Sequence, residues 1–500
     1  MTAIDLRAGM SLHAKRAQQK AKIRQTVGIL HEESVGDWKR EKNEALVEKL
    51  LCMKRQGLLF VIFLLSMTAS AYDAKINGIY FNFDFVNNTA EVSLGDDYYS
   101  GRVNIPSRVI YNSNDYHVTS IGNAAFADCE ELTFVNIPSS VVSIGNSAFD
   151  GCIRLSSISM SSSVTSIGNR AFADCDNLRS LILPNSLTSI GTDAFQNCRK
   201  LTSVNIPYGL TSISRGAFMY CVNLTNVTIP NSVTTIDDRA FDGCELTTLN
   251  IPSSVTSIGS YAFAQNHSLV TVTIPNSVTS IGDAAFWWCN GLTNVTLGNS
   301  IETIGDGAFA NCAKLTSIII PDAVTTIGER AFQNCSSLES VKILAMNPPV
   351  VYDDSFNKYD IPLYVPESSF YRYNNQNPWK KFAPLLTLTN EDIMSLKCAK
   401  PTISFIDGEL VFKCETEDVT FHYTIRAIGD QTEVADKVSL TTLTTTYEVA
   451  VYANKKGYLN SDVSTKVVKM ALGNKGDMND DGVISITDVI ILLNKILESQ

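Results

Sequence analysis

The chain has 500 residues, of which 45% are hydrophobic and 18% are charged, so it can form two or three domains with filled cores and lacks the composition of a disordered or collagen-like chain. Residues 1–71 hold 12 of the 40 Lys and Arg and 7 of the 51 Asp and Glu, which leaves 28 basic and 44 acidic residues and a net charge of −16 in the remainder. Because nucleic-acid binding needs a basic surface, we expect no nucleic acid among the partners.

A secretory signal peptide is predicted over residues 53–71. Two basic residues, Lys54 and Arg55, precede an apolar run that is shorter than the roughly 20 residues of a membrane-spanning helix. The segment Ala69-Ser70-Ala71 that follows is typical of a cleavage site. We therefore expect secretion or display at the cell surface after cleavage near Ala71, with Tyr72 as the mature N-terminus.

Residues 1–52 precede this segment, although a signal peptide normally begins at the initiator methionine. We interpret residues 1–52 as a misread N-terminal extension, with Met53 as the true start. The alternative is a cytoplasmic tail in front of an uncleaved signal anchor.

The middle of the chain is an internal repeat. The motif Ala-Phe-x-x-Cys, with one substitution of its Cys, recurs ten times, with Phe at positions 126, 149, 172, 195, 218, 241, 263, 286, 309 and 332. The spacing is 23 residues at every step except one of 22. In the unit 201–221 the positions predicted to face inward are Leu201, Val204, Ile206, Leu210, Ile213, Ala217 and Phe218.

A coil of this length cannot close a core alone, so its apolar face must be covered by the coils on either side. The segment Val-x-Ile-Pro alternates as a strand does, and its Pro ends the pairing. The second apolar segment, Val-Thr-x-Ile-Gly, predicts a shorter strand or turn. We expect its Gly to supply a sharp bend toward Ala-Phe, where the Phe ring fills the coil interior.

These units resemble the BspA-like leucine-rich repeat family, whose consensus Leu-Thr-x-Val-x-Ile-Pro-x-x-Val-Thr-x-Ile-Gly-x-x-Ala-Phe-x-x-Cys is matched over about residues 118–343. The departures are Asn266 in place of Cys, Ser161 and Gly298 in place of Pro, and one residue missing before Glu245. The resemblance implies a mainly β fold, a right-handed solenoid of about ten coils, export, and a role in adhesion or surface interaction. Because the ends of a solenoid need covering, we assign residues 72–117 and 344–392 as N- and C-terminal caps.

Residues 397–472 shift in composition toward alternating Thr, Val and Tyr. Asp407-Gly408 lies between two strand-like segments and is typical of a hairpin turn. The region is similar to the small, immunoglobulin-like β-sandwich spacers of secreted bacterial carbohydrate-active and surface proteins. Cys398 and Cys414 flank the predicted hairpin, and an oxidising environment favours a disulfide between them, with two free thiols as the alternative.

Residues 473–500 contain a 12-residue loop with the ligand spacing of a calcium site, followed by a predicted helix. The predicted ligands are Asp477, Asn479, Asp481, the carbonyl of Val483, Ser485 and Asp488. Asp rather than Glu at the last loop position makes this segment resemble a dockerin repeat, of which that family carries two copies and this sequence one. The resemblance implies calcium as the cofactor and a cohesin-like docking partner.

Nine of the 12 cysteines stand in the repeat column, at positions 129, 152, 175, 198, 221, 244, 289, 312 and 335. Cysteines in neighbouring coils would lie about 4.8 Å apart, within disulfide range. However, nine is an odd number, and Asn266 takes the remaining position of the column. We therefore expect buried, unpaired thiols, rather than disulfides or a metal site.

An enzymatic function is not expected. Beyond the predicted signal peptide the sequence holds three histidines, His117, His267 and His422, in unrelated contexts, and neither a phosphate-binding glycine loop nor a nucleophile elbow occurs. A pair of glycosidase carboxylates is the alternative, but Asp and Glu are scattered over non-equivalent positions of the coils.

The two positions after each repeat Phe are small or polar in eight units, and Met219-Tyr220 and Trp287-Trp288 break this rule. One interpretation is that the large side chains fill grooves between coils. The other is an exposed ligand-binding site, because large aromatic side chains anchor interfaces. Three coils separate the pairs, roughly 15 Å at strand spacing, so one ligand could contact both.

Two functions remain open at this point. In the first, the chain is an exported, non-enzymatic protein whose solenoid binds host proteins, other bacteria or glycans. In the second, it is a subunit of an extracellular assembly, recruited through the dockerin-like tail and active in polysaccharide processing. Deletion of residues 473–500 separates them, because it should spare ligand binding in the first and abolish recruitment in the second.

Overall fold

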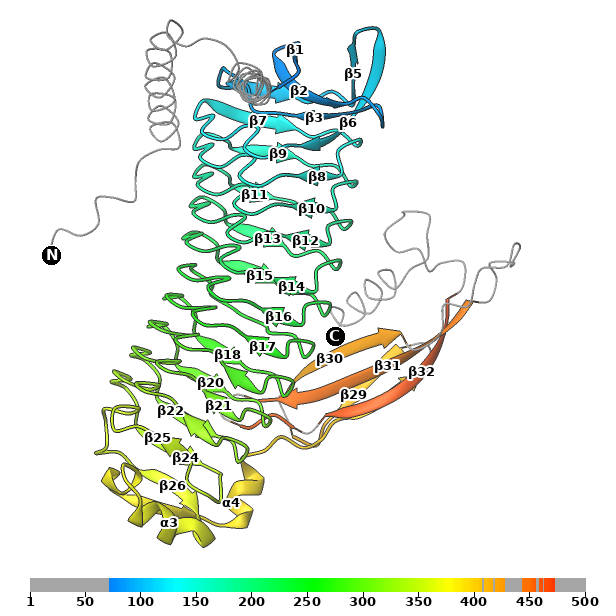
Figure 1. Cartoon of the computed structure of the whole chain (residues 1–500). Coiled ribbons are helices and arrows are strands. Elements are labelled where there is room, and N and C mark those ends of the chain that lie inside the picture. Colours follow the sequence, from blue (N-terminus) through cyan, green and yellow to red (C-terminus); the bar gives the residue numbers. More distant parts are fainter. Residues whose placement is uncertain are drawn as a thin grey trace, which may run out of the picture.

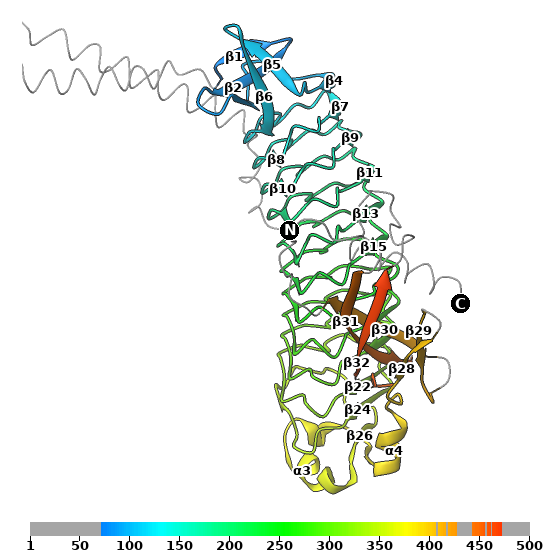
Figure 2. The same ribbon diagram turned by 90° about the vertical axis from the view of Figure 1, so that its right-hand side faces the viewer.

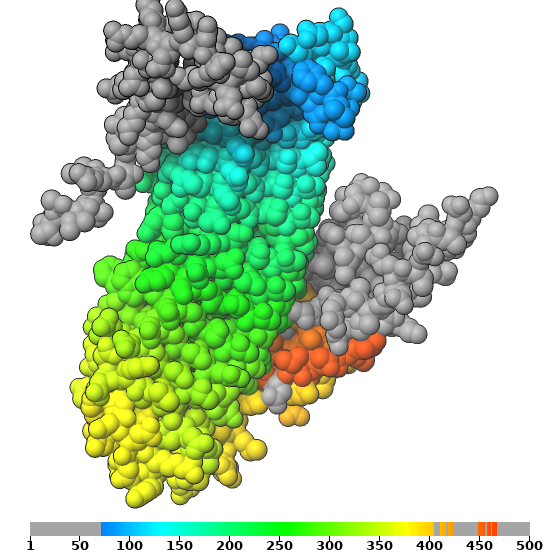
Figure 3. Space-filling view, in the orientation of Figure 1, coloured from blue at the N-terminus to red at the C-terminus, as the bar shows by residue number. Residues whose placement is uncertain are grey.

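The computed structural model describes residues 72–406, 409–416, 419–427, 443–455, 458–461 and 463–472. The predicted extension, signal peptide and calcium loop lie outside the described residues. The described chain forms a long column of stacked coils, with a smaller C-terminal β module attached at its side (Figure 1, Figure 3). The column has about 12 coils of roughly 23 residues, so the mainly β solenoid expected from the repeats is confirmed.

Most coils contribute one short strand to each of two rows that follow the column (Figure 1). Row one is formed by β4 (Gly101–Asn104), β7 (Leu132–Asn136), β9 (Ser157–Ser159), β11 (Ser180–Leu181), β13 (Ser203–Asn205), β15 (Asn226–Thr228), β18 (Thr271–Thr273), β20 (Asn294–Thr296), β22 (Ser317–Ile320), β24 (Ser340–Ile343), β26 (Leu363–Pro366) and β27 (Leu385–Leu388). Row two is formed by β3 (Thr89–Val92), β6 (Asn114–Ile121), β8 (Ser143–Ile144), β10 (Ser166–Ile167), β12 (Ser189–Ile190), β14 (Ser212–Ile213), β16 (Thr235–Ile236), β17 (Ser257–Ile258), β19 (Ser280–Ile281), β21 (Thr303–Ile304), β23 (Thr326–Ile327) and β25 (Val350–Val351). Paired strands run parallel in a register of one repeat, as where Ile167 pairs with Ile144 and Ile190. Equal side chains therefore stack on one another along the column.

A continuous aromatic stack fills the column. Its twelve members are Tyr99, Phe126, Phe149, Phe172, Phe195, Phe218, Phe241, Phe263, Phe286, Phe309, Phe332 and Phe356. Neighbouring Phe rings lie 4.8 to 5.6 Å apart between centroids and are nearly parallel. The estimate of ten coils was therefore too low, because the coils at Tyr99 and Phe356 lack the Ala-Phe-x-x-Cys motif and escaped the search.

The column cysteines are buried, as predicted, and their thiols have a defined role. The Sγ of each column cysteine from Cys152 onward donates a hydrogen bond to the Phe carbonyl of the preceding coil, at 3.1 to 3.3 Å. Burial raises the pKa of Cys129 to about 11 and that of Cys289 and Cys335 to about 12. These thiols therefore stay protonated and able to donate at neutral pH.

Asn266 replaces one cysteine and compensates for the short coil before it. In a normal coil the Leu N–H bonds to the carbonyl of the Cys three residues earlier, as Leu155 does to Cys152 at 3.0 Å. The missing residue leaves Leu246 only two positions after Cys244, and its N–H donates to Asn266 Oδ1 at 3.0 Å instead. The Asn266 Nδ2 also donates to the Phe241 carbonyl at 2.9 Å, which replaces the thiol hydrogen bond. The Asn266 substitution therefore compensates for the missing residue before Glu245.

The glycines that follow the Ile of row two have a role different from the one expected. A Cβ on Gly168 would lie 2.6 Å from the Asn146 backbone nitrogen, and one on Gly191 would lie 2.4 Å from that of Asn169. Neither glycine has a positive φ. Glycine is therefore required for the close approach of successive coils rather than for a sharp bend.

Irregular elements lie at both ends of the column. At the N-terminal end β1 (Ala74–Ile76), β2 (Ile79–Asp84) and β5 (Arg108–Tyr111) add antiparallel strands to row two. The other end carries the 3-10 turns η1 (Glu367–Ser369) and η2 (Trp379–Lys381) and the helices α3 (Phe370–Asn375) and α4 (Asn390–Ser395). Trp379 is buried there, 6.0 Å from the last Phe ring, so the aromatic stack ends against an indole. Among the described residues, the helices are too short and polar to span a membrane.

The C-terminal module consists of two antiparallel sheets in its described part. Its strands are β28 (Thr402–Ile406), β29 (Glu409–Lys413), β30 (Thr420–Ala427), β31 (Leu443–Asn454) and β32 (Ser464–Leu472). The hairpin predicted around Asp407-Gly408 is confirmed, because Ile406 pairs with Glu409. Phe412 of this hairpin contacts Phe421 of the three-stranded sheet, with centroids 5.7 Å apart. The assignment to a sandwich family stays a prediction.

The module lies against the side of the column (Figure 2), and asparagine side chains bond the two together. Asn460 is buried and donates Nδ2–H to the Ile274 carbonyl at 3.0 Å, while its own carbonyl accepts from Asn299 at 2.9 Å. Asn276 donates to the Ser461 carbonyl at 2.7 Å. These contacts reach the turns that follow β18 and β20. The segments around the repeat Phe residues lie elsewhere on each coil.

Candidate functional site

Each repeat Phe stands in a tight five-residue turn, which we call the Phe corner and which runs from two residues before Phe to two residues after it. The first and last residues of the Phe corner have positive φ throughout the ten repeats. At the last position φ lies between 58° and 76° for Asp128, Gly151, Asp174, Asn197, Tyr220, Gly243, Gln265, Trp288, Asn311 and Asn334. Glycine, Asn and Asp tolerate this left-handed conformation, whereas a bulky side chain is costly there. Tyr220, Gln265 and Trp288 are therefore the departures at this position, and Tyr220 and Trp288 are the two with large aromatic side chains.

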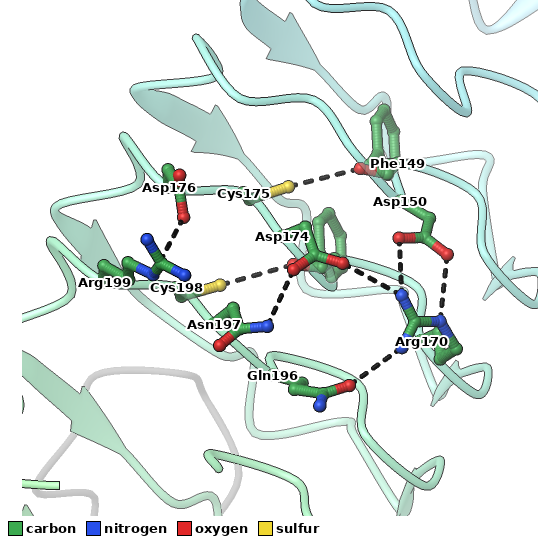
Figure 4. A network of polar contacts seen from close by, with 11 residues as sticks. Phe149, Asp150, Arg170, Asp174, Cys175, Asp176, Gln196, Asn197, Cys198 and Arg199 are labelled. Carbon is green, nitrogen blue, oxygen red and sulfur yellow. Dashed lines mark hydrogen bonds and ion pairs between the residues drawn. The ribbon is translucent and has the colours of Figure 1, made fainter. Parts of the chain in front are cut away.

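In the Phe corners of the second to fourth repeats, polar side chains bond one another across the coils (Figure 4). Arg170 bridges three coils, with its guanidinium 3.0 Å from both Asp150 and Asp174 and 2.8 Å from Gln196. Asn197 donates to Asp174 at 2.8 Å. Asp174 and Asn197, which suit the left-handed backbone at the last position of the corner, therefore also find hydrogen-bond partners among neighbouring side chains.

Tyr220 lies against the next coil. A Cβ on Gly243 would come within 2.4 Å of the Tyr220 ring, so the ring covers the backbone of that glycine. Met219 and Tyr220 are both half-buried. The structure thus places this pair in a groove between coils, which is the first of the two interpretations drawn from the sequence.

Trp287 and Trp288 lie in an aromatic cluster with residues of the preceding coil. Their ring centroids are 5.4 Å apart, and Tyr261 meets Trp287 edge-on at 6.4 Å. His267 lies 6.4 Å from the Trp288 ring, and its Nδ1 is 2.9 Å from the Trp288 carbonyl. Trp287 is half-buried, whereas Trp288 keeps 42% of its surface exposed. The two predicted pairs therefore differ in the structure. The Tyr220 ring lies against the next coil, whereas the Trp288 ring is exposed.

Arg239, in the coil before that of Tyr261, contacts this cluster. The Arg239 guanidinium lies over the Tyr261 ring, 4.5 Å from its centroid, and pairs with Asp242 at 3.1 Å. Asp242 is buried and also accepts from Gln265 at 2.9 Å. Burial raises the pKa of the Asp242 carboxyl, and the hydrogen bond from Gln265 and the charge of Arg239 oppose that shift. Arg239 thus holds the Tyr261 ring in place, and Tyr261 in turn packs against Trp287.

The next coil supplies an amide to both indoles. With its oxygen turned toward them, the Asn311 side chain accepts from Trp288 Nε1 at 2.8 Å and from Trp287 Nε1 at 3.3 Å. Beyond it, an open groove of about 750 Å³ runs from Trp288 past Asn334 to Asn357. We call the cluster of Tyr261, Trp287 and Trp288 together with Asn311 the aromatic corner.

Sequence reasoning found the tryptophans but missed Tyr261, His267 and Asn311. Together with the tryptophans these residues come from three successive coils, and they meet only because the coils stack. Tyr261 stands two residues before its repeat Phe, and a search of that column for large side chains would have found it.

The remaining predicted sites do not join this cluster. Cys398 and Cys414 are free thiols, and Cys414 Sγ donates to the Ala399 carbonyl at 3.1 Å, so the disulfide is not present in this structure and stays a prediction. Burial raises the pKa of Cys398 to about 11. Over the described ranges, no group of three His, Cys, Asp or Glu side chains could hold a metal ion. The predicted calcium ligands fall outside those ranges.

Comparison with solved structures gives several leucine-rich repeat proteins. A leucine-rich cell surface protein from Faecalibacterium prausnitzii is 28% identical, covers 63% of this chain and 94% of its own, and has a TM-score of 0.40. A leucine-rich repeat protein from Bacteroides ovatus is 27% identical, with coverage of 64% and 100% and a TM-score of 0.39. One from T. pallidum is 26% identical, with coverage of 47% and 87% and a TM-score of 0.27. No curated protein gives a significant match.

The family comparison concerns the coils themselves. The model described as the BspA type leucine-rich repeat region matches residues 94–224 and 211–339. These residues include the ten Ala-Phe corners and extend over the coil at Tyr99. The repeat region of this chain therefore belongs to the BspA-type leucine-rich repeat family.

Proposed function

We propose that this protein is exported and acts at the cell surface as a non-enzymatic binding protein, with the aromatic corner as its ligand site. One observation carries the proposal: the exposed indole of Trp288 occupies a backbone conformation that favours Asn, Asp or Gly. A large side chain in the left-handed region costs about 1–3 kcal/mol, and such strain is concentrated at functional sites. A role in packing does not account for this cost, because the ring is not in the core.

The chemistry of the aromatic corner fits binding. Indole and phenol rings provide flat apolar area at a small entropic cost, and for that reason they dominate the energetics of many interfaces. Asn311 holds both indole N–H groups and so limits the rotation of the rings. A preorganised aromatic surface loses little freedom on binding, which favours affinity. We include adhesion to a host or bacterial surface in the proposal, as the use to which this binding is put.

The test compares two substitutions at equivalent backbone positions. The full chain, Trp288→Asn and Tyr220→Asn are measured by biolayer interferometry on immobilised mucin, collagen and bacterial polysaccharide. We expect at least one surface to bind the wild type, roughly tenfold weaker binding by Trp288→Asn, and no change for Tyr220→Asn. Equal binding by all three proteins on every surface that binds would contradict the proposal.

A second function is favoured by the Asp477-x-Asn-x-Asp-Gly spacing: the tail binds calcium and recruits the chain to a cohesin-like partner. Without a cation the carboxylates of Asp477, Asp481 and Asp488 repel one another at close range. We expect calorimetry of the full chain to show calcium binding that Asp477→Ala removes. Equal heats from both proteins would contradict the calcium site. If deletion of residues 473–500 left recruitment unchanged, that result would contradict docking through the tail but not calcium binding.

A further inference from the structure

The groove beside the aromatic corner has a regular polar floor. Trp288, Asn311, Asn334 and Asn357 occupy successive coils, and the latter three line the groove that begins at Trp288. The Phe rings beneath the first three of these residues are 5.3 and 5.5 Å apart. An indole is therefore followed by three amides, one in each successive coil.

Asn334 and Asn357 are hydrogen-bonded to each other, but their amides are not saturated. Asn357 Nδ2 donates to Asn334 Oδ1 at 3.0 Å, and the Asn334 backbone N–H donates to Asn357 Oδ1 at 2.9 Å. With the Asn311 oxygen turned toward the indoles, the Asn311 amide nitrogen faces that of Asn334 at 3.0 Å, so these two side chains do not hydrogen-bond each other. An amide offers two donors and two lone pairs, so each of these side chains keeps hydrogen-bonding capacity after the contacts within the row. Asn334 and Asn357 are exposed and can present it to a ligand.

The backbone of the groove favours a ligand that needs no β-strand pairing. The Trp288 N–H donates to the Ala310 carbonyl at 2.9 Å, and the Asn311 N–H donates to the Gln333 carbonyl at 2.7 Å. These groups are used between coils, so the groove offers a peptide little of the free strand edge on which β-augmentation depends. A nucleic acid could stack on the indole, but the net charge of −16 beyond residue 71 opposes it.

A sugar chain matches what the groove does offer. A pyranose has a flat C–H face that stacks on an indole and a rim of hydroxyl groups that both donate and accept hydrogen bonds, as amides do. Lys314, Lys358 and Asp360 also line the groove and add two donors and an acceptor, and the Lys358 ammonium donates to the Ser336 carbonyl at 3.3 Å. The indole, the amides and these charged groups each have a counterpart on an extended glycan.

We propose that this groove binds a linear glycan that runs parallel to the solenoid, with one sugar stacked on Trp288 and the following sugars hydrogen-bonded to Asn311, Asn334 and Asn357. This inference rests on the proposed function, because it names the ligand class of the same site. Because the amides lie in successive coils, we expect affinity to increase with chain length until the ligand spans the groove.

The test is isothermal titration calorimetry of the full chain with hexasaccharides of β-linked glucose, xylose, N-acetylglucosamine and galacturonic acid. We expect at least one to bind, and its monosaccharide to bind far more weakly. Trp288→Asn should weaken that binding roughly ten- to thirtyfold and Asn334→Ala roughly three- to tenfold, whereas Tyr220→Asn should leave it unchanged. Binding of the galacturonic acid chain alone would assign the lysines to its carboxylates and support the inference in the same way.

Two results would overturn the inference. One is the absence of binding by all four chains, and the other is glycan binding that Trp288→Asn does not change. A protein ligand that binds after enzymatic deglycosylation, and that Trp288→Asn weakens, would leave the proposed function intact and exclude the glycan assignment. Circular dichroism of each variant confirms that the coils are formed before binding is compared.

Discussion

The Phe corners built on Phe172 and Phe286 have the same backbone but different side chains. Asp174 and Trp288 share the last position of the turn, with φ of 58° and 60°. Asp174 suits that conformation and is satisfied by Arg170 and Asn197, whereas Trp288 does not suit it and faces solvent. In a repeat protein the other coils are internal controls. A residue that departs from the backbone preference of its column and also faces solvent, as Trp288 does and Tyr220 does not, indicates a role outside folding.

The largest effects should come from the Phe stack that both corners share. We expect Phe195→Ala and Phe286→Ala each to lower the free energy of unfolding by about 3–5 kcal/mol, because both rings are fully buried between flanking rings. Urea unfolding followed by circular dichroism measures both. A difference above about 2 kcal/mol between them would show that the two regions are not built on equivalent scaffolds.

A smaller effect is expected at Asn266, which lies between the two regions. Asn266→Cys keeps a donor for the Phe241 carbonyl but leaves the Leu246 N–H without an acceptor, which should cost about 1–3 kcal/mol. Insertion of one residue after Cys244 in that variant should recover the loss, because Leu246 then reaches the Cys244 carbonyl. Additive losses from the insertion and the substitution would disprove the coupling.

Transfer of the aromatic side chain to the polar region sharpens the comparison further. Asp174→Trp should lower the free energy of unfolding by about 1–2 kcal/mol, the cost of a bulky residue in the left-handed region. Loss of the Arg170 contact adds little, because that ion pair is partly exposed and Arg170 keeps its contact with Asp150. Thermal unfolding of this variant beside Asp174→Asn isolates the effect of the ring. Equal stability of the two variants would mean that the turn tolerates any side chain.

The repeat made most of the fold predictable. The inward positions, the burial of the cysteine column and the two strand rows follow from a motif that occurs ten times in one environment. The coils at Tyr99 and Phe356 were missed because they keep the aromatic ring and lose the flanking residues. The positive φ of the corner positions could not be predicted either. A column of small or polar residues is compatible with several backbone conformations, and only the structure distinguishes them.

Contacts between coils and between domains were beyond sequence reasoning. Asn311 reaches Trp287 and Trp288 from the next coil, and no pattern within one repeat predicts that contact. Asn460 docks the C-terminal module on Ile274, 186 residues away in sequence, through a hydrogen bond that no periodicity indicates. Candidate residues could therefore be named from the sequence, but the site they form could not.

The most direct test of the account is the stability of Trp288→Asn beside that of the wild type. Asn suits the left-handed position, so relief of strain should offset the lost ring contacts, and we expect the free energy of unfolding to stay unchanged or to rise by up to about 1 kcal/mol. Urea unfolding of the full chain gives this value for both proteins. A loss of more than about 2 kcal/mol would show that the indole is a packing residue and would contradict the assignment of the aromatic corner as a binding site.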